Sequence, residues 1–161
     1  YSTAIVYGKP VRPFGIAPQL PISLGNEEVS IELVFRNPLV HPTLFMRREA
    51  VEAIGGYRES AAEDYDLALR FALADKKIMR HWLPTVAYRL HEDQVTADPL
   101  WQAKVYGDEM ITHSRAGLRK HLTSDSGSSP ELLRERILKW RPLLRIEGRG
   151  VPGIIARTEK G

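Results

Sequence analysis

The strongest constraint on the fold is an apolar helical segment that begins directly after a pair of carboxylates. Glu63 and Asp64 precede a run in which apolar residues recur at the three- and four-residue spacing of an amphipathic helix. The spacing predicts a helix from Asp64 to about Asp75, and its expected buried face consists of Leu67, Phe71 and Ala74, with Tyr65, Ala68 and Ala72 beside them. The free N–H groups of a first helical turn favour ionised carboxylates, so we expect a base at neutral pH here. An ordinary acidic helix start would have the same pattern.

Composition places the chain among globular proteins with a single core. Its 161 residues can bury such a core, and 43% hydrophobic with 27% charged residues is ordinary for a domain of this kind. The absence of cysteine excludes disulfides, thiolate metal sites and a cysteine nucleophile. No secretory signal is visible, and no apolar run approaches the roughly 18 to 20 residues that span a bilayer. We therefore expect a cytoplasmic protein, and contact with the inner face of the membrane stays open.

The net charge of +3 conceals a basic C-terminal region. From Arg115 onward, eleven lysines and arginines stand against five acidic residues. Such a region can contact nucleic acid, anionic lipid or an acidic partner. Because neither interleaved aromatic residues nor a nucleic-acid motif accompanies the charge, a solvated helix face is the better interpretation, and we expect no nucleic-acid partner.

The remaining elements alternate between short strands and helices, which predicts the α/β class. Strands are expected at 2–7, 43–46, 78–82 and 86–90, the last two separated around Pro84. Further helices are expected at 26–36, 47–54, 100–122 and 131–140. Four prolines argue against regular structure between residues 8 and 25. Residues 123–129 are expected to form a flexible link, and the tail at 148–161 is expected to be disordered.

Three groups of residues are suited to chemistry. Gly55 and Gly56 would end the helix before them, and their bare backbone would also let a sugar or phosphate approach closely. A carboxylate at Asp64 could take a proton from an incoming hydroxyl while Glu63 positions the same hydroxyl. His91 follows a strand among polar neighbours, so a metal or phosphate role is open, although a lone histidine is more often structural.

Two further arrangements are weaker as sites. Asp64-Tyr65-Asp66 forms an Asp-x-Asp string, but residues two apart on a helix point about 200° apart, so these carboxylates do not face one ion. A metal-dependent phosphoester hydrolase would have an incomplete ligand set, made of Glu63, Asp64, His91 and Asp93. We interpret the other histidines as structural, namely His41, His81, His113 and His121.

Four motifs, in their order and spacing, resemble the second half of family 2 glycosyltransferases. They are Asn37-Pro38 with Thr43-Leu44-Phe45-Met46-Arg47-Arg48, Gly55-Gly56-Tyr57, the segment from Ala62 to Arg70, and Tyr88-Arg89-Leu90-His91. The resemblance extends from about Asn37 to Thr96, and the ordered set is more specific than any single motif. It implies a partial GT-A-like fold, in which a few-stranded mixed sheet is packed by helices, followed here by a C-terminal helical extension.

The resemblance also implies roles for the candidate residues. Asp64 matches the general base that deprotonates the acceptor hydroxyl, and Glu63 matches its partner near the acceptor. Gly55 and Gly56 match a substrate-binding glycine loop beside the donor sugar, and Tyr57, which follows them, is expected to bind substrate as well. His91 matches a late histidine that approaches the metal or the diphosphate. The implied reaction is inverting transfer from a nucleotide-sugar donor to a glycan or lipid-linked acceptor. A divalent cation, Mn²⁺ or Mg²⁺, would steady the departing diphosphate in the intact enzyme.

Residues 1–36 depart from this family, because they supply neither its nucleotide-binding strands nor its metal-gripping Asp-x-Asp motif. We therefore expect an acceptor-side fragment that turns over little and binds no cation alone. The expected organisation is an acceptor-side half at 1–98, a helical extension at 99–147 and a tail at 148–161. A fragment that exposes a sheet edge would tend to form homo-oligomers. The alternative is a non-catalytic module that binds a partner or a membrane through its basic C-terminal region.

Overall fold

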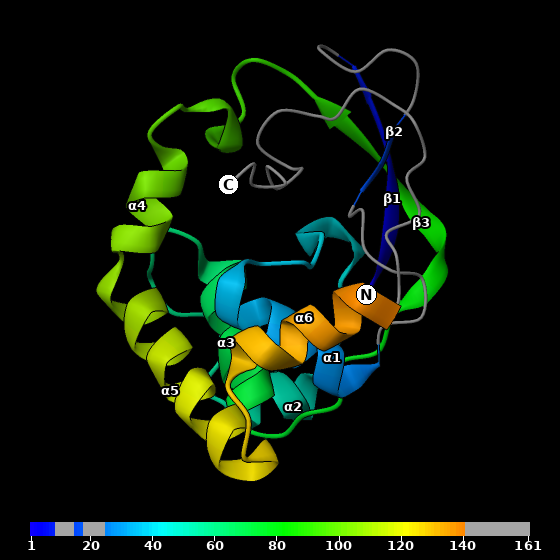
Figure 1. The fold of residues 1–161 in the computed structure, drawn as a ribbon. Coiled ribbons are helices and arrows are strands. Elements are labelled where there is room, and N and C mark those ends of the chain that lie inside the picture. The colour runs from blue at the N-terminus through cyan, green and yellow to red at the C-terminus, as the bar shows by residue number, and fades with distance from the viewer. Residues whose placement is uncertain (9–14, 18–24, 141–161) are drawn as a thin grey trace.

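The chain folds as a mixed α/β structure, with a small sheet on one side and the helices gathered beside and below it (Figure 1). The computed structural model describes residues 1–8, 15–17 and 25–140. The expected tail at 148–161 lies outside the described residues, as does most of the proline-rich segment. The α/β class is confirmed, whereas the GT-A-like arrangement and the expected division after residue 98 stay predictions.

Three strands form the sheet, in the order β2-β1-β3. The central strand β1 (Ser2–Gly8) is antiparallel to β2 (Gly15–Ala17) and parallel to β3 (His81–Leu90). The expected strand at 2–7 is confirmed. β2 corrects the expectation that regular structure is missing between residues 8 and 25.

β3 is one continuous strand, where the sequence predicted two strands separated around Pro84. Pro84 pairs with Thr3 of β1, and the register shifts on both sides of Thr3. Proline cannot donate a hydrogen bond to a neighbouring strand, and such irregularities are where a sheet tolerates it. The strand therefore continues past Pro84 because the pairing is locally irregular.

The predicted strand at 43–46 is wrong. His41–Thr43 form a short 3-10 helix, η1, in which Pro42 occupies an early position where its missing N–H is not needed. The Thr43 hydroxyl accepts the N–H of Ser2 at 3.1 Å and so ties η1 to the start of β1. Phe45, which a buried strand would cover, is 96% exposed.

The described residues contain six α-helices and a second 3-10 helix. Their bounds are α1 (Asn26–Phe35), α2 (Arg48–Ala53), α3 (Glu63–Leu73), η2 (Val95–Ala97), α4 (Trp101–Gly107), α5 (Glu109–Ser126) and α6 (Pro130–Trp140). The helices expected at 26–36, 47–54, 64–75 and 131–140 are confirmed to within a few residues.

The helix expected at 100–122 is instead two helices, α4 and α5, with Asp108 between them. The Asp108 carboxylate accepts the N–H groups of Met110 at 2.9 Å and Ile111 at 3.1 Å, which starts α5 as a new helix. α5 then runs through the first part of the expected flexible link and ends at Gly127 in the left-handed conformation. The second Asp108 oxygen accepts the N–H of Ala61 at 2.8 Å, so the helix cap also holds the segment before α3.

The hydrophobic core lies among the helices, and α3 is at its centre. Its buried residues are Val29, Leu33, Val34, Ala62, Tyr65, Ala68, Leu69, Ala72, Val105, Ile111 and Leu118. Because α1 and α5 both pack on α3, Leu69 and Asp66 are buried along with Leu67. Ala74, predicted for the buried face, is exposed. The expected helical extension therefore shares a core with the segment before it.

Side chains from three other helices cap the C-terminal end of α1. The last carbonyl groups of a helix have no partner within it. Here Tyr65 Oη donates to Leu33 O at 2.6 Å, Arg115 Nε donates to Val34 O at 3.0 Å, and Tyr106 Oη donates to Phe35 O at 3.2 Å. These bonds fix α3, α5 and α4 around the point where the chain leaves α1.

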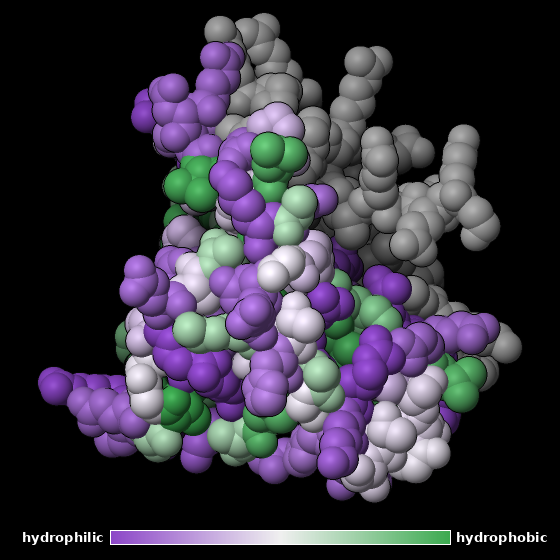
Figure 2. Space-filling view, turned by 90° about the vertical axis from the view of Figure 1, so that its left-hand side faces the viewer, coloured by the Kyte–Doolittle hydropathy of each residue, from purple (hydrophilic) through white to green (hydrophobic). Residues whose placement is uncertain are grey.

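The outward face on the side of α4 and α5 is mainly hydrophilic, with apolar residues in separate areas (Figure 2). Three apolar side chains in and beside these helices are exposed, namely Leu100, Tyr106 and Met110. Among the described residues, no helix combines the length and the apolar character needed to cross a bilayer.

We expect Leu118→Ala to lower the free energy of unfolding by about 3 kcal/mol, because Leu118 is fully buried in the core that α5 shares with α3. Urea unfolding followed by circular dichroism measures this loss. Leu100→Ala is the control, at a residue that is 64% exposed, and should change the free energy by less than about 0.5 kcal/mol. Equal effects of the two substitutions would contradict a shared core.

Candidate functional site

Asp64 lies in the first turn of α3, and both oxygens of its carboxylate are held. Oδ1 accepts the N–H of Tyr65 at 2.8 Å, and Oδ2 accepts the side-chain amide of Asn37 at 3.1 Å. Asn37 is itself oriented, because its Oδ1 accepts the N–H of Leu39 at 3.0 Å. The carboxylate therefore has a defined orientation within the folded chain.

The pKa of Asp64 is raised above the ordinary value of 3.8. Burial is the largest cause, while His41 and the N–H of Tyr65 act in the opposite direction and Glu63 adds a smaller rise. The helix start alone led us to expect a favoured ionised form, so burial outweighs the helix terminus here. A carboxylate with a raised pKa is a better proton acceptor once it is ionised.

Tyr57 and His41 form a hydrogen-bonded pair beside this carboxylate. Tyr57 Oη lies 2.9 Å from His41 Nε2, and the ring centroids are 5.8 Å apart. Burial raises the pKa of Tyr57, and the charges of Asp64 and Glu63 raise it further, so the phenol keeps its proton and can donate it to the imidazole. Tyr57 is 46% exposed, so its ring also presents a surface to the outside.

Gly55 and Gly56 form a turn that ends α2, as the sequence predicted. Their φ angles of 82° and 68° lie in the left-handed region that glycine adopts without strain. No described atom lies within 4 Å of the position that a β-carbon would occupy on either residue. The turn, which we call the glycine turn, is therefore open on that side, as a loop that a ligand approaches should be.

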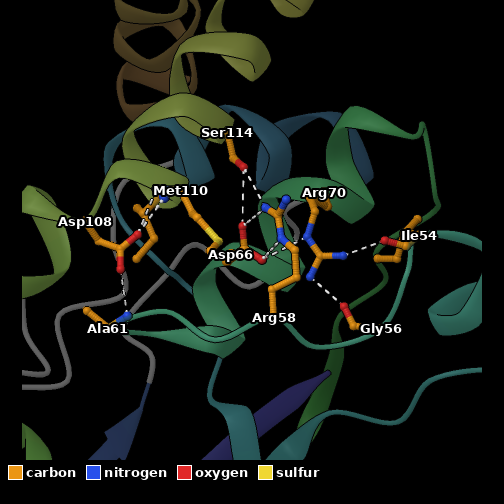
Figure 3. A network of polar contacts seen from close by, with 10 residues as sticks. Ile54, Gly56, Arg58, Ala61, Asp66, Arg70, Asp108, Met110 and Ser114 are labelled. Atoms are coloured by element: carbon orange, nitrogen blue, oxygen red, sulfur yellow. Dashed lines mark hydrogen bonds and ion pairs between the residues drawn. The ribbon is translucent and has the colours of Figure 1, made fainter.

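A buried network, which we call the arginine clamp, holds the glycine turn against α3 (Figure 3). Its centre is Asp66, which is 0% exposed. Asp66 Oδ2 accepts from Arg58 Nε at 3.0 Å and from Arg70 Nε at 2.9 Å, and Oδ1 is bound by Arg58 Nη2. Arg70 also donates to the carbonyls of Ile54 and Gly56, both at 2.6 Å. Burial opposes ionisation of Asp66, but the hydrogen bonds from the two arginines hold its pKa below the ordinary value.

The structure brings together one part of the predicted site and leaves another part separate. Asp64 and Tyr57 lie near the start of α3, where Glu63 is exposed in the same helical turn. The carbonyls of the glycine turn instead bind Arg70, in the last turn of α3. His91 is exposed just after β3, and its backbone N–H donates to Gln94 Oε1 at 3.3 Å. In the described part of the chain, no hydrogen bond or ion pair links the His91 side chain to Asp64 or Glu63.

Within the ranges that the structure describes, no three histidine, aspartate or glutamate side chains form a metal-binding group. Asp64 and Asp66 bind different partners, as their helical spacing predicts. The cation of the intact enzyme and the role of His91 stay predictions.

Asn37 and His41 are the site residues that the sequence analysis missed. In the sequence, Asn37 is part of the Asn37-Pro38 motif without a role of its own, and His41 is interpreted as structural. Asn37 lies in the loop between α1 and η1, and His41 is the first residue of η1. The ends of this segment are fixed by the caps of α1 and by the bond from Ser2 to Thr43. Asn37 and His41 are far from Asp64 in the sequence, so no local pattern indicates that they lie beside it. The one available signal is the Asn37-Pro38 motif.

Replacing Asp66 with asparagine should lower the free energy of unfolding by about 3 kcal/mol, because two arginines would lose their buried counter-ion. Urea unfolding at neutral pH measures this change. The matched control is Glu52→Gln, which breaks the exposed Arg48–Glu52 pair and should change stability by less than about 0.5 kcal/mol. A loss no larger than that of the control would show that the clamp does not stabilise the fold.

The stability difference between the wild-type chain and Asp64→Asn should depend on pH. Because the pKa of Asp64 is raised by folding, the folded state binds its proton more tightly than the unfolded state. Wild-type stability relative to the variant should therefore fall as pH rises from 3.8 through the raised pKa. Urea unfolding at several pH values from about 3.5 to about 7 measures the difference, with exposed Glu59→Gln as the control. A difference that is constant, or that grows in favour of the wild type, would contradict the raised pKa.

Comparison of the chain with protein-family models, with curated proteins and with solved structures finds no match. The resemblance to family 2 glycosyltransferases therefore rests on the four ordered motifs.

Proposed function

We propose that the chain is the acceptor-side part of an inverting glycosyltransferase in which Asp64 is the general base. The observation that carries this proposal is the Asp64 carboxylate, which has a raised pKa and is oriented by Asn37. A general base needs a fixed position and a pKa closer to the working pH than that of a free carboxylate. The open glycine turn and the four ordered motifs support the same assignment.

In the proposed reaction, the acceptor hydroxyl binds within hydrogen-bond reach of the Asp64 carboxylate. The hydroxyl oxygen forms a bond to the anomeric carbon of the donor sugar while its proton passes to Asp64. The bond from that carbon to the diphosphate breaks on the opposite face, so the configuration inverts and the electron pair leaves with the nucleoside diphosphate. Asn37 keeps the carboxylate oriented, and the exposed ring of Tyr57 lines the approach of the acceptor.

The proposed reaction also needs residues that bind the nucleotide-sugar donor and the cation, and the described residues of this chain do not include a set with these roles. The resemblance assigns nucleotide-sugar binding and the cation to the first half of the family, which has no counterpart in residues 1–36. The proposed partners are accordingly a nucleotide-sugar donor and a glycan or lipid-linked acceptor. A cytoplasmic location, with contact at the inner face of the membrane, belongs to the same proposal.

The non-catalytic alternative has less support, because several basic residues of the C-terminal region are engaged inside the chain. Arg115 lies over the ring of Tyr106 in addition to capping α1. Arg134 bonds to buried Glu32 at 3.0 Å and lies 4.8 Å from the ring centroid of Phe35. Basic side chains used in this way are less available to a partner or a membrane.

Asp64→Asn should reduce sugar transfer by about 10²- to 10⁴-fold, the usual contribution of a positioned general base. The assay uses the protein expressed from its complete reading frame and measures nucleoside diphosphate released from a panel of UDP- and GDP-sugars with glycan and lipid-linked acceptors.

Glu59→Gln is the matched control, because Glu59 is an exposed carboxylate in the same segment. It should leave transfer unchanged. Undiminished transfer by Asp64→Asn would remove Asp64 from the role of general base.

A further inference from the structure

We infer that Arg70 is a positioning residue, which holds Tyr57 in the orientation that places it against His41 beside Asp64. The Arg70 guanidinium acts through the chain around Tyr57, since its hydrogen bonds go to Asp66 and to two carbonyls of the glycine turn. The catalytic consequence rests on the proposed function, whereas the positioning itself does not.

The three nitrogens of the Arg70 guanidinium bind three different acceptors. Nε donates to Asp66, Nη1 donates to Ile54 O, and Nη2 donates to Gly56 O (Figure 3). The two carbonyls stand on either side of Gly55, within the left-handed turn. Because the guanidinium is a rigid planar fork, it fixes these acceptors relative to one another. The Arg70 side chain is only 11% exposed, so water competes little for these bonds.

Tyr57 lies between two attachment points of the arginine clamp. Gly56, which precedes it, is held by Arg70, and Arg58, which follows it, is bound to Asp66. Residues 57–59 belong to neither a helix nor a strand. The direction of the exposed Tyr57 side chain therefore depends on the clamp, and a turn free to rotate would carry the phenol away from His41.

The clamp is also joined to α5. Arg58 Nη2 donates to Ser114 Oγ at 3.4 Å, and the same hydroxyl donates to Asp66 at 3.4 Å (Figure 3). α5 thus contacts the clamp through Ser114. Loss of Arg70 should disturb the acceptor side of the site without removing any group that touches the reacting atoms.

The test compares the His41 imidazole signal in ¹H–¹³C NMR spectra of the wild-type chain and its variants. Tyr57→Phe removes the hydroxyl and defines the His41 signal without its partner. Arg70→Lys keeps a positive charge beside Asp66 but lacks the fork that binds two carbonyls and a carboxylate together. We expect the His41 signal of Arg70→Lys to move to its position in Tyr57→Phe. A signal that stays at the wild-type position overturns the inference, because a positive charge alone would then suffice.

Arg48→Lys is the matched control. Arg48 lies on α2, just before the glycine turn, and forms an exposed pair with Glu52 at 2.7 Å. This substitution changes the same type of side chain without touching the carbonyls of the turn, and should leave the His41 signal unchanged. A shift equal to that of Arg70→Lys would overturn the specific role of Arg70.

A second measurement needs no variant and applies if Arg70→Lys does not fold. Backbone ¹⁵N relaxation of the wild-type chain reports order parameters for Gly55, Gly56 and Tyr57. We expect values of about 0.85, as in rigid backbone, and values below about 0.6 would overturn the inference. Neither measurement involves sugar transfer, so failure of the proposed function and failure of this inference are distinguishable.

Discussion

The end of α1 is the point on which the arrangement of the other helices depends. Its last carbonyls accept hydrogen bonds from Tyr65, Arg115 and Tyr106, which belong to α3, α5 and α4. A buried helix terminus without such partners would be strongly unfavourable, so the capping side chains and the packing of their helices are coupled. Asn37 follows two residues after α1, and its contact with Asp64 is a direct result of this arrangement.

Two carboxylates, two residues apart on α3, have opposite electrostatic environments. Burial raises the pKa of Asp64, and this effect outweighs the opposing effects of His41 and the Tyr65 N–H. Asp66 is fully buried between two arginines, so its pKa falls. Divergent pKa values of neighbouring acids are a common way to separate a proton-transferring group from a charge that only supports it. The same division describes the proposed base and the arginine clamp.

The errors of the sequence analysis share one physical origin. The strand expected at 43–46 is replaced by the end of η1, which Thr43 ties to Ser2, and β3 continues through Pro84 because the pairing with Thr3 is irregular. The long helix expected at 100–122 is interrupted where Asp108 caps α5 and binds Ala61. In each case a partner distant in sequence decided the local conformation, and a pattern read over a few residues cannot include such a partner.

The sequence by itself determined the α/β class, the helix that starts with Glu63 and Asp64, and the left-handed glycine turn. These features follow from hydrophobic periodicity and from backbone preferences, which act within a few residues. Only the tertiary structure decided that Asn37 and His41 lie beside Asp64, that Asp66 binds two arginines, and that the pKa of Asp64 rises. Burial and long-range hydrogen bonds set these properties, and both arise only when α1, α3 and α5 pack together.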